Sequence, residues 1–132
     1  MWKLGPLLLC SALVLIAFTL PGCDGSSRQL QSLSISPAAG ATQVQFTALG
    51  MFVGSSETAT VNAMWWTTQP WTYPPTPFIV TVSSSGLAQC EASAPAGTYT
   101  IWAVAPVDQS VPVSKMTMTT KQVSATGQLT CP

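Results

Sequence analysis

The sequence contains no histidine and very little charge. Lysine and arginine together number 4, as do aspartate and glutamate, so charged residues make up only 6% of the chain. Histidine is the commonest metal ligand, and a nucleophilic triad needs a base of this kind. Nucleic-acid binding needs many lysine and arginine contacts with phosphates. These shortages argue against an enzyme, against a metal or other cofactor, and against a nucleic-acid partner.

The chain after residue 22 also lacks any apolar stripe with helical spacing. Short runs alternate apolar and polar residues instead, and such alternation predicts strands with one buried face. Turn residues, mostly glycine and proline, separate the runs. The sequence therefore predicts an all-β domain, a β-sandwich of about seven strands. The strands are expected at 33–36, 44–48, 61–65, 79–82, 87–90 and 99–103, with 129–131 as a last edge strand.

The first residues read as an export signal. Lys3 precedes an uncharged apolar run at 7–20, which is followed by Leu20-Pro21-Gly22-Cys23. This tetrapeptide resembles the lipobox of bacterial lipoproteins, in which the cysteine is lipidated and the signal is cut just before it. The resemblance implies a signal peptide at 1–22, a lipid on Cys23, and an exported protein anchored to a membrane of the bacterial cell envelope. An uncleaved membrane helix and an ordinary cleavage with release remain open alternatives.

The remaining cysteines form an even pair. Cys10 falls in the signal and Cys23 is assigned to the lipid, which leaves Cys90 and Cys131. An even pair in an oxidising compartment predicts a disulfide. Two free thiols are the alternative. We expect a tether at 23–29 and a single domain at 30–132.

Five segments in order resemble a bacterial immunoglobulin-like domain of group 2. They are 33–37 (LSISP), 44–48 (VQFTA), 65–70 (WWTTQP), 80–87 (VTVSSSGL) and 96–101 (AGTYTI). The match covers about residues 30–105 and implies an immunoglobulin-like β-sandwich at a bacterial surface. Residues 106–132 form a C-terminal extension beyond the match. The Cys90–Cys131 bond would hold this extension down, and it is not the inter-sheet bridge of antibody domains.

The tryptophans fall on both faces of the expected strands. Trp65 shares a face with Val61 and Ala63, which predicts core packing, whereas Trp66 and Trp102 point the other way.

The segment 69–78 carries Trp71, Tyr73 and Phe78 among four prolines, which exclude a central strand. Together with Trp66, these side chains are the candidate binding residues. The alternative is a stiff loop whose aromatic residues cover the edge of the sandwich.

The two resemblances and the shortage of catalytic residues together suggest a function. We expect a lipid-anchored, non-catalytic envelope module that acts in adhesion or in contact with a protein or carbohydrate. The alternative is a structural accessory subunit of a larger envelope complex with no ligand site of its own.

Overall fold

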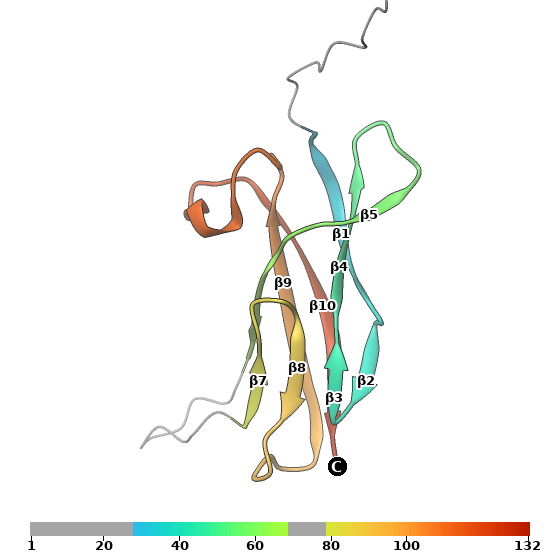
Figure 1. The fold of residues 1–132 in the computed structure, drawn as a ribbon, viewed down its shortest axis with the longest axis vertical. Helices are drawn as coiled ribbons and strands as arrows, with labels where there is room; N and C mark the ends of the chain where they lie inside the picture. Colours follow the sequence, from blue (N-terminus) through green and yellow to red (C-terminus); the bar gives the residue numbers. More distant parts are fainter. Residues whose placement is uncertain (1–27, 69–78) are drawn as a thin grey trace, which may run out of the picture.

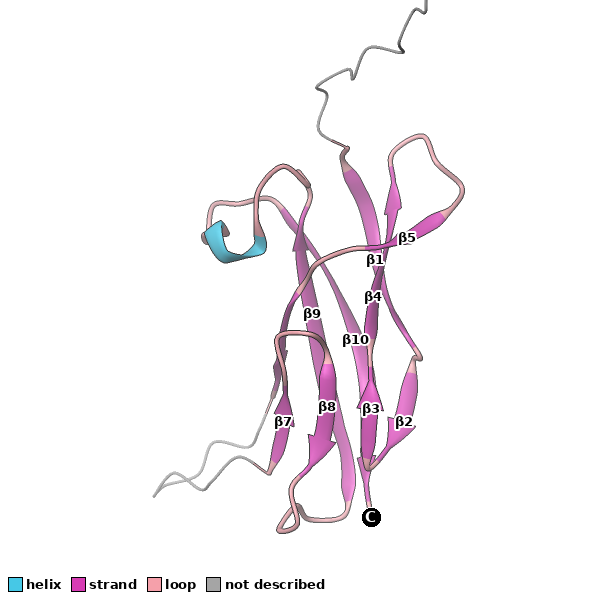
Figure 2. Cartoon of the chain, in the orientation of Figure 1, coloured by secondary structure: helices cyan, strands magenta, loops and turns pink. Residues whose placement is uncertain are grey.

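The structure, a computed structural model, describes residues 28–68 and 79–132, and this part of the chain is all-β (Figure 2). It contains ten strands and one short 3-10 helix. The strands are β1 (Leu30–Ser36), β2 (Ala39–Ala41), β3 (Gln43–Gln45), β4 (Thr47–Phe52), β5 (Thr58–Thr60), β6 (Met64–Thr67), β7 (Val80–Val82), β8 (Leu87–Cys90), β9 (Gly97–Pro106) and β10 (Gln122–Cys131), and the helix is η1 (Val113–Lys115).

The strands form three sheets, in the orders β1-β4-β5, β3-β8-β7 and β2-β10-β9-β6. Only Phe46 separates β3 from β4, so one continuous run of chain belongs to both three-stranded sheets. The first strand divides in a similar way. β1 pairs with β4, and after the cis peptide Ser36–Pro37 the chain continues into β2, which runs parallel to β10 in the four-stranded sheet. The three-stranded sheets are therefore tied to the four-stranded sheet by covalent continuity as well as by packing.

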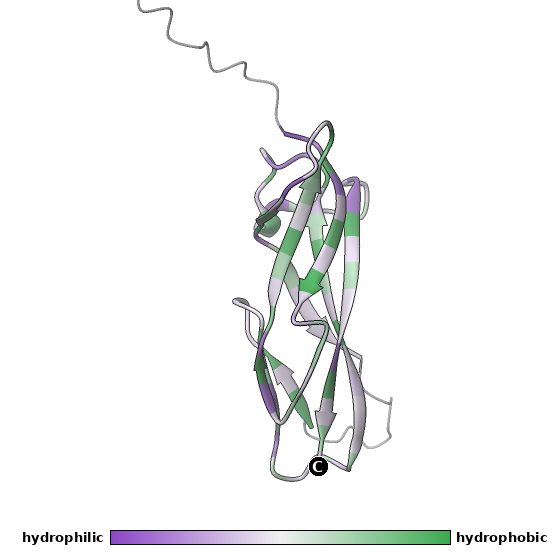
Figure 3. Cartoon of the chain, turned by 90° about the vertical axis from the view of Figure 1, so that its right-hand side faces the viewer, coloured by the Kyte–Doolittle hydropathy of each residue, from purple (hydrophilic) through white to green (hydrophobic). Residues whose placement is uncertain are grey.

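All three sheets contribute to one main core. Its largest fully buried side chains include Phe46, Ile101 and Leu129, which are 0% exposed. Trp65 is half-buried and packs against this cluster, as the alternation in 61–65 predicts. Apolar and polar bands alternate along the strands in Figure 3, which is the pattern expected when one face of each strand is buried.

The number of strands and the place of the last one differ from the sequence prediction. The chain of the predicted first strand continues into a second sheet, so it forms β1 and β2. The predicted second strand is broken at Phe46 into β3 and β4, and β5 is an additional short strand. The expected edge strand at 129–131 is the end of β10, which is not an edge strand. It pairs with β9 over its whole length, from Gln122↔Pro106 to Cys131↔Gly97, and its other side pairs with β2. Residues 122–131 are thus central to the four-stranded sheet.

The described part is elongated, and its two ends lie far apart along the long axis (Figure 1). β1 begins at the top of that view, and the C-terminus lies at the bottom. Local contacts hold the beginning of the described chain against the rest of the domain. The Arg28 guanidinium carbon lies 4.0 Å from the centre of the Phe52 ring, and the Leu30 amide donates to the Val107 carbonyl at 2.7 Å. Arg28, where the described residues begin, therefore lies at the end of the domain opposite to the C-terminus.

Candidate functional site

Of the candidate residues proposed from the sequence, the structure describes Trp66 and the two paired cysteines. Cys23 lies outside the described residues, as do Trp71, Tyr73 and Phe78. In the described part of the chain, three features are candidates for function: the surface around Trp66, the disulfide, and a cleft beside Trp65.

Trp66 stacks on Trp102 on the outer face of the four-stranded sheet. The two ring centroids are 6.0 Å apart and the ring planes differ by 3°. The two residues are direct partners in the antiparallel register of β6 and β9, and cross-strand neighbours of this kind interact through their side chains. Trp66 remains 38% exposed, so part of this residue is open to solvent.

Strand periodicity explains why this pair faces outward. Trp65 pairs with Ala103, and both belong to the core or pack against it. Successive side chains of a strand point to opposite faces, so Trp66 and Trp102 lie on the other side of the sheet. Period-two spacing gave this orientation from the sequence. It could not give the stack, which depends on the pairing register between β6 and β9.

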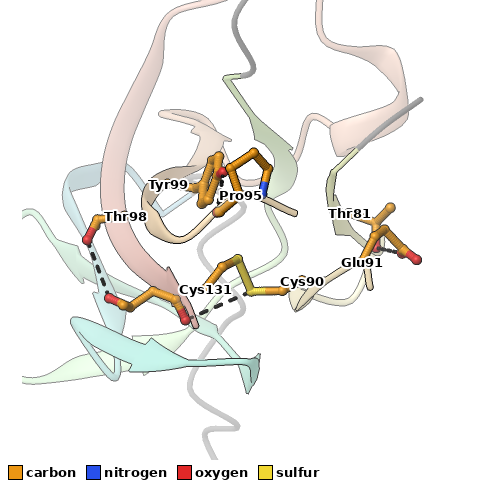
Figure 4. The surroundings of a disulfide bond; sticks show 8 residues. Thr81, Cys90, Glu91, Pro95, Thr98, Tyr99 and Cys131 are labelled. Carbon is orange, nitrogen blue, oxygen red and sulfur yellow. Dashed lines mark hydrogen bonds between the residues drawn. A yellow bond between two sulfur atoms is a disulfide. The ribbon is translucent and has the colours of Figure 1, made fainter. Parts of the chain in front are cut away.

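The predicted Cys90–Cys131 disulfide is present, with an S–S distance of 2.05 Å and a Cα–Cα distance of 5.8 Å (Figure 4). It joins β8 to the last residue of β10, and these strands belong to different sheets. The bond therefore does more than hold down a C-terminal extension: it links two sheets. Nearby, the Tyr99 hydroxyl donates to the Pro95 carbonyl at 2.8 Å and fixes the turn between β8 and β9.

A cleft of about 960 Å³ opens next to Trp65. Three segments that are distant in the sequence surround it. They are the link from β5 to β6, the β7–β8 turn at Ser84 and Ser85, and the Pro112–Met116 stretch around η1. Phe46 and Ala48 of the core also line it. No local pattern in the sequence signals this cleft, because its walls come together only in the folded chain.

The described residues contain no group of three or more histidine, cysteine, aspartate or glutamate side chains placed to hold a metal ion. Within 28–68 and 79–132 there is no helix with the length and apolar character needed to span a membrane.

No protein-family model matches the chain, and no curated protein matches it either. The functional assignment accordingly depends on the residues and geometry described above.

Proposed function

We propose that this protein is a lipid-anchored, non-catalytic module of the bacterial cell envelope, with an immunoglobulin-like sandwich that makes contact with an envelope partner. The observation that carries the contact function is the stacked indole pair on the outer sheet face, in which Trp66 stays 38% exposed. Aromatic side chains are enriched among residues that dominate binding energy, because they bury a large area and lose little conformational freedom.

The strand order supports the immunoglobulin-like assignment. In a constant-type immunoglobulin sandwich, strands A, B, E and D form one sheet and strands C, F and G form the other. β1 corresponds to strand A, and β3 together with β4 corresponds to strand B. The strands β6, β7, β8, β9 and β10 correspond to C, D, E, F and G, respectively. The observed neighbours then reproduce both sheets, with β2 added beside G. β5 lies outside this scheme.

The position of Arg28 supports a defined orientation at the membrane. Five residue steps separate Cys23 from Arg28, so their Cα atoms lie within roughly 18 Å of each other at full extension. Arg28 is held at the top of the domain by its contact with Phe52. A lipid on Cys23 would keep this end near the bilayer, and the disulfide end would point away from it (Figure 1).

The anchor is tested by intact mass spectrometry of the full-length chain extracted from bacterial membranes. We expect a chain that starts at Cys23 and carries added acyl mass. The Cys23→Ala variant should carry no acyl mass, because it has no thiol at this position to be lipidated. The Cys10→Ala variant is the matched control, and its product should equal the wild-type product. An unmodified wild-type Cys23 would refute the lipid anchor.

The contact face is tested with the Trp66→Ala variant. Loss of the indole stack should lower the free energy of unfolding by at least about 1 kcal/mol, because an aromatic pair of this kind contributes roughly 0.5–1.5 kcal/mol beyond the apolar area that it buries. We expect binding of the nanodisc-bound protein to fragments of its own cell envelope to fall by at least about tenfold.

Met118→Ala is the matched control for this experiment. It also removes an exposed hydrophobic side chain, one that is fully exposed and lies in the β9–β10 connection. This variant should bind like wild type. Equal binding by the wild type and the Trp66→Ala variant would contradict a contact function of this face and would favour an accessory subunit without a ligand site here.

A further inference from the structure

The cleft beside Trp65 has the dimensions of a ligand site. Its volume of about 960 Å³ falls within the roughly 300–1,000 Å³ typical of small-molecule pockets. It is separate from the stacked pair, because Trp65 and Trp66 point to opposite faces of β6. Whatever it binds therefore goes beyond the contact function proposed above.

One wall of the cleft comes from an unusually long connection. Residues 107–121 join β9 to β10, two strands that are antiparallel neighbours. Hairpin loops usually need only about 2–5 residues, and connections of more than about 12–15 residues are commonly functional. The connection is ordered by its own hydrogen bonds: the Lys115 amide donates to the Pro112 carbonyl at 2.9 Å, and the Ser110 amide donates to Asp108 Oδ1 at 2.9 Å.

The floor and the rim of the cleft differ in chemistry. The floor is apolar, with the half-buried indole of Trp65 beside the core. The rim carries hydroxyl and amide groups, including those of Asn62, Ser84 and Ser114, and the described lining is uncharged. Within the described part of the chain, these three side chains have no hydrogen-bond partner. They come from three separate segments around one indole.

We infer that this cleft binds a neutral oligosaccharide. A pyranose ring presents C–H groups on its faces and hydroxyl groups around its edge. Its faces match an indole floor, and its hydroxyls match uncharged donors and acceptors at the rim. A charged ligand would lose hydration in this cleft without gaining an opposite charge. A purely apolar ligand would leave the rim groups without hydrogen bonds as it covered them.

The test uses the full-length chain in phosphatidylcholine nanodiscs and saturation-transfer difference spectra. The neutral probes are triacetylchitotriose and maltotriose, and trigalacturonic acid is the charged comparison. We expect saturable binding of a neutral trisaccharide and none of the charged one. Ser84→Trp, which places a large side chain on the exposed rim, should weaken neutral binding at least about tenfold.

The Ser32→Trp variant is the matched control. Ser32 is also exposed, lies on β1, and does not line the cleft, so this variant should keep full binding. Ser114→Trp provides a second block from the segment around η1 in case Ser84→Trp unfolds. The inference is overturned if neither neutral probe binds, if the charged probe binds equally well, or if both blocking variants bind like wild type. None of these outcomes bears on the Trp66 contact face.

Discussion

Breaking the Cys90–Cys131 bond is expected to lower the free energy of unfolding by about 4 kcal/mol. The two cysteines are 41 positions apart, and cross-linking a loop of that length removes conformational entropy from the unfolded chain. A domain of about 100 residues has a total stability on the order of 5–15 kcal/mol. The loss corresponds to a fall of roughly 15–20 °C in Tm, and it leaves the reduced protein with a stability on the order of 1–11 kcal/mol.

The cross-link can be separated from the packing of the sulfur atoms. Cys131 is 2% exposed, so replacing it also removes buried contacts. Denaturant unfolding should therefore compare the oxidised chain, the same chain in a thiol reductant, and the Cys90→Ala/Cys131→Ala variant. The reduced chain keeps both side chains, and it should show most of the loss. An unchanged unfolding midpoint after verified reduction would mean that the inter-sheet link contributes nothing to stability.

Gly86→Ala is expected to cost about 3 kcal/mol or more. Gly86 has a φ of +88°, a backbone conformation that costs other residues roughly 1–2 kcal/mol. A Cβ atom here would also collide with the Phe46 carbonyl oxygen and would lie 2.9 Å from Cζ2 of Trp65. The Phe46 amide already donates to the Gly86 carbonyl at 2.9 Å, so neither backbone segment can withdraw without breaking that bond.

Gly54→Ala is the matched control for the collision. Gly54 has a φ of +79°, and a Cβ at this position would meet nothing within 4 Å. The Gly54→Ala variant should lose only the conformational penalty of roughly 1–2 kcal/mol. Denaturant unfolding measures the loss in free energy of unfolding for each variant. The difference between the two losses gives the cost of the overlap with Phe46 and Trp65. Equal losses of stability in the two variants would show that the β7–β8 turn moves away from Phe46 at little cost in free energy.

The strand faces could be predicted because local alternation records burial directly. The pattern in 61–65 placed Trp65 toward the core and Trp66 away from it, and the packing confirms both. The cysteine count likewise predicted the disulfide, since only one pair remained after the signal and the lipobox. The first inference uses the order of a few neighbouring residues, and the second uses the number of cysteines in the chain.

The sequence predicted only the last three residues of β10, because several inward positions of this strand carry small residues. Ala125 and Gly127 face inward, so the apolar alternation of Gln122–Cys131 is weak in the sequence. The structure explains the glycine: a Cβ at Gly127 would lie 3.2 Å from both Phe46 and Ile35. A small residue there leaves room for the large Phe46 ring, and this relation between distant positions has no local signal.

The sequence by itself determined the class of the domain, the buried face of most strands and the paired cysteines, because alternation and composition are local properties. Only the tertiary structure decided that the disulfide joins two sheets, that Trp66 stacks on Trp102, and that the β9–β10 connection walls the cleft beside Trp65. Each of these depends on strand register and on the return of distant segments, which are set by packing of the whole chain.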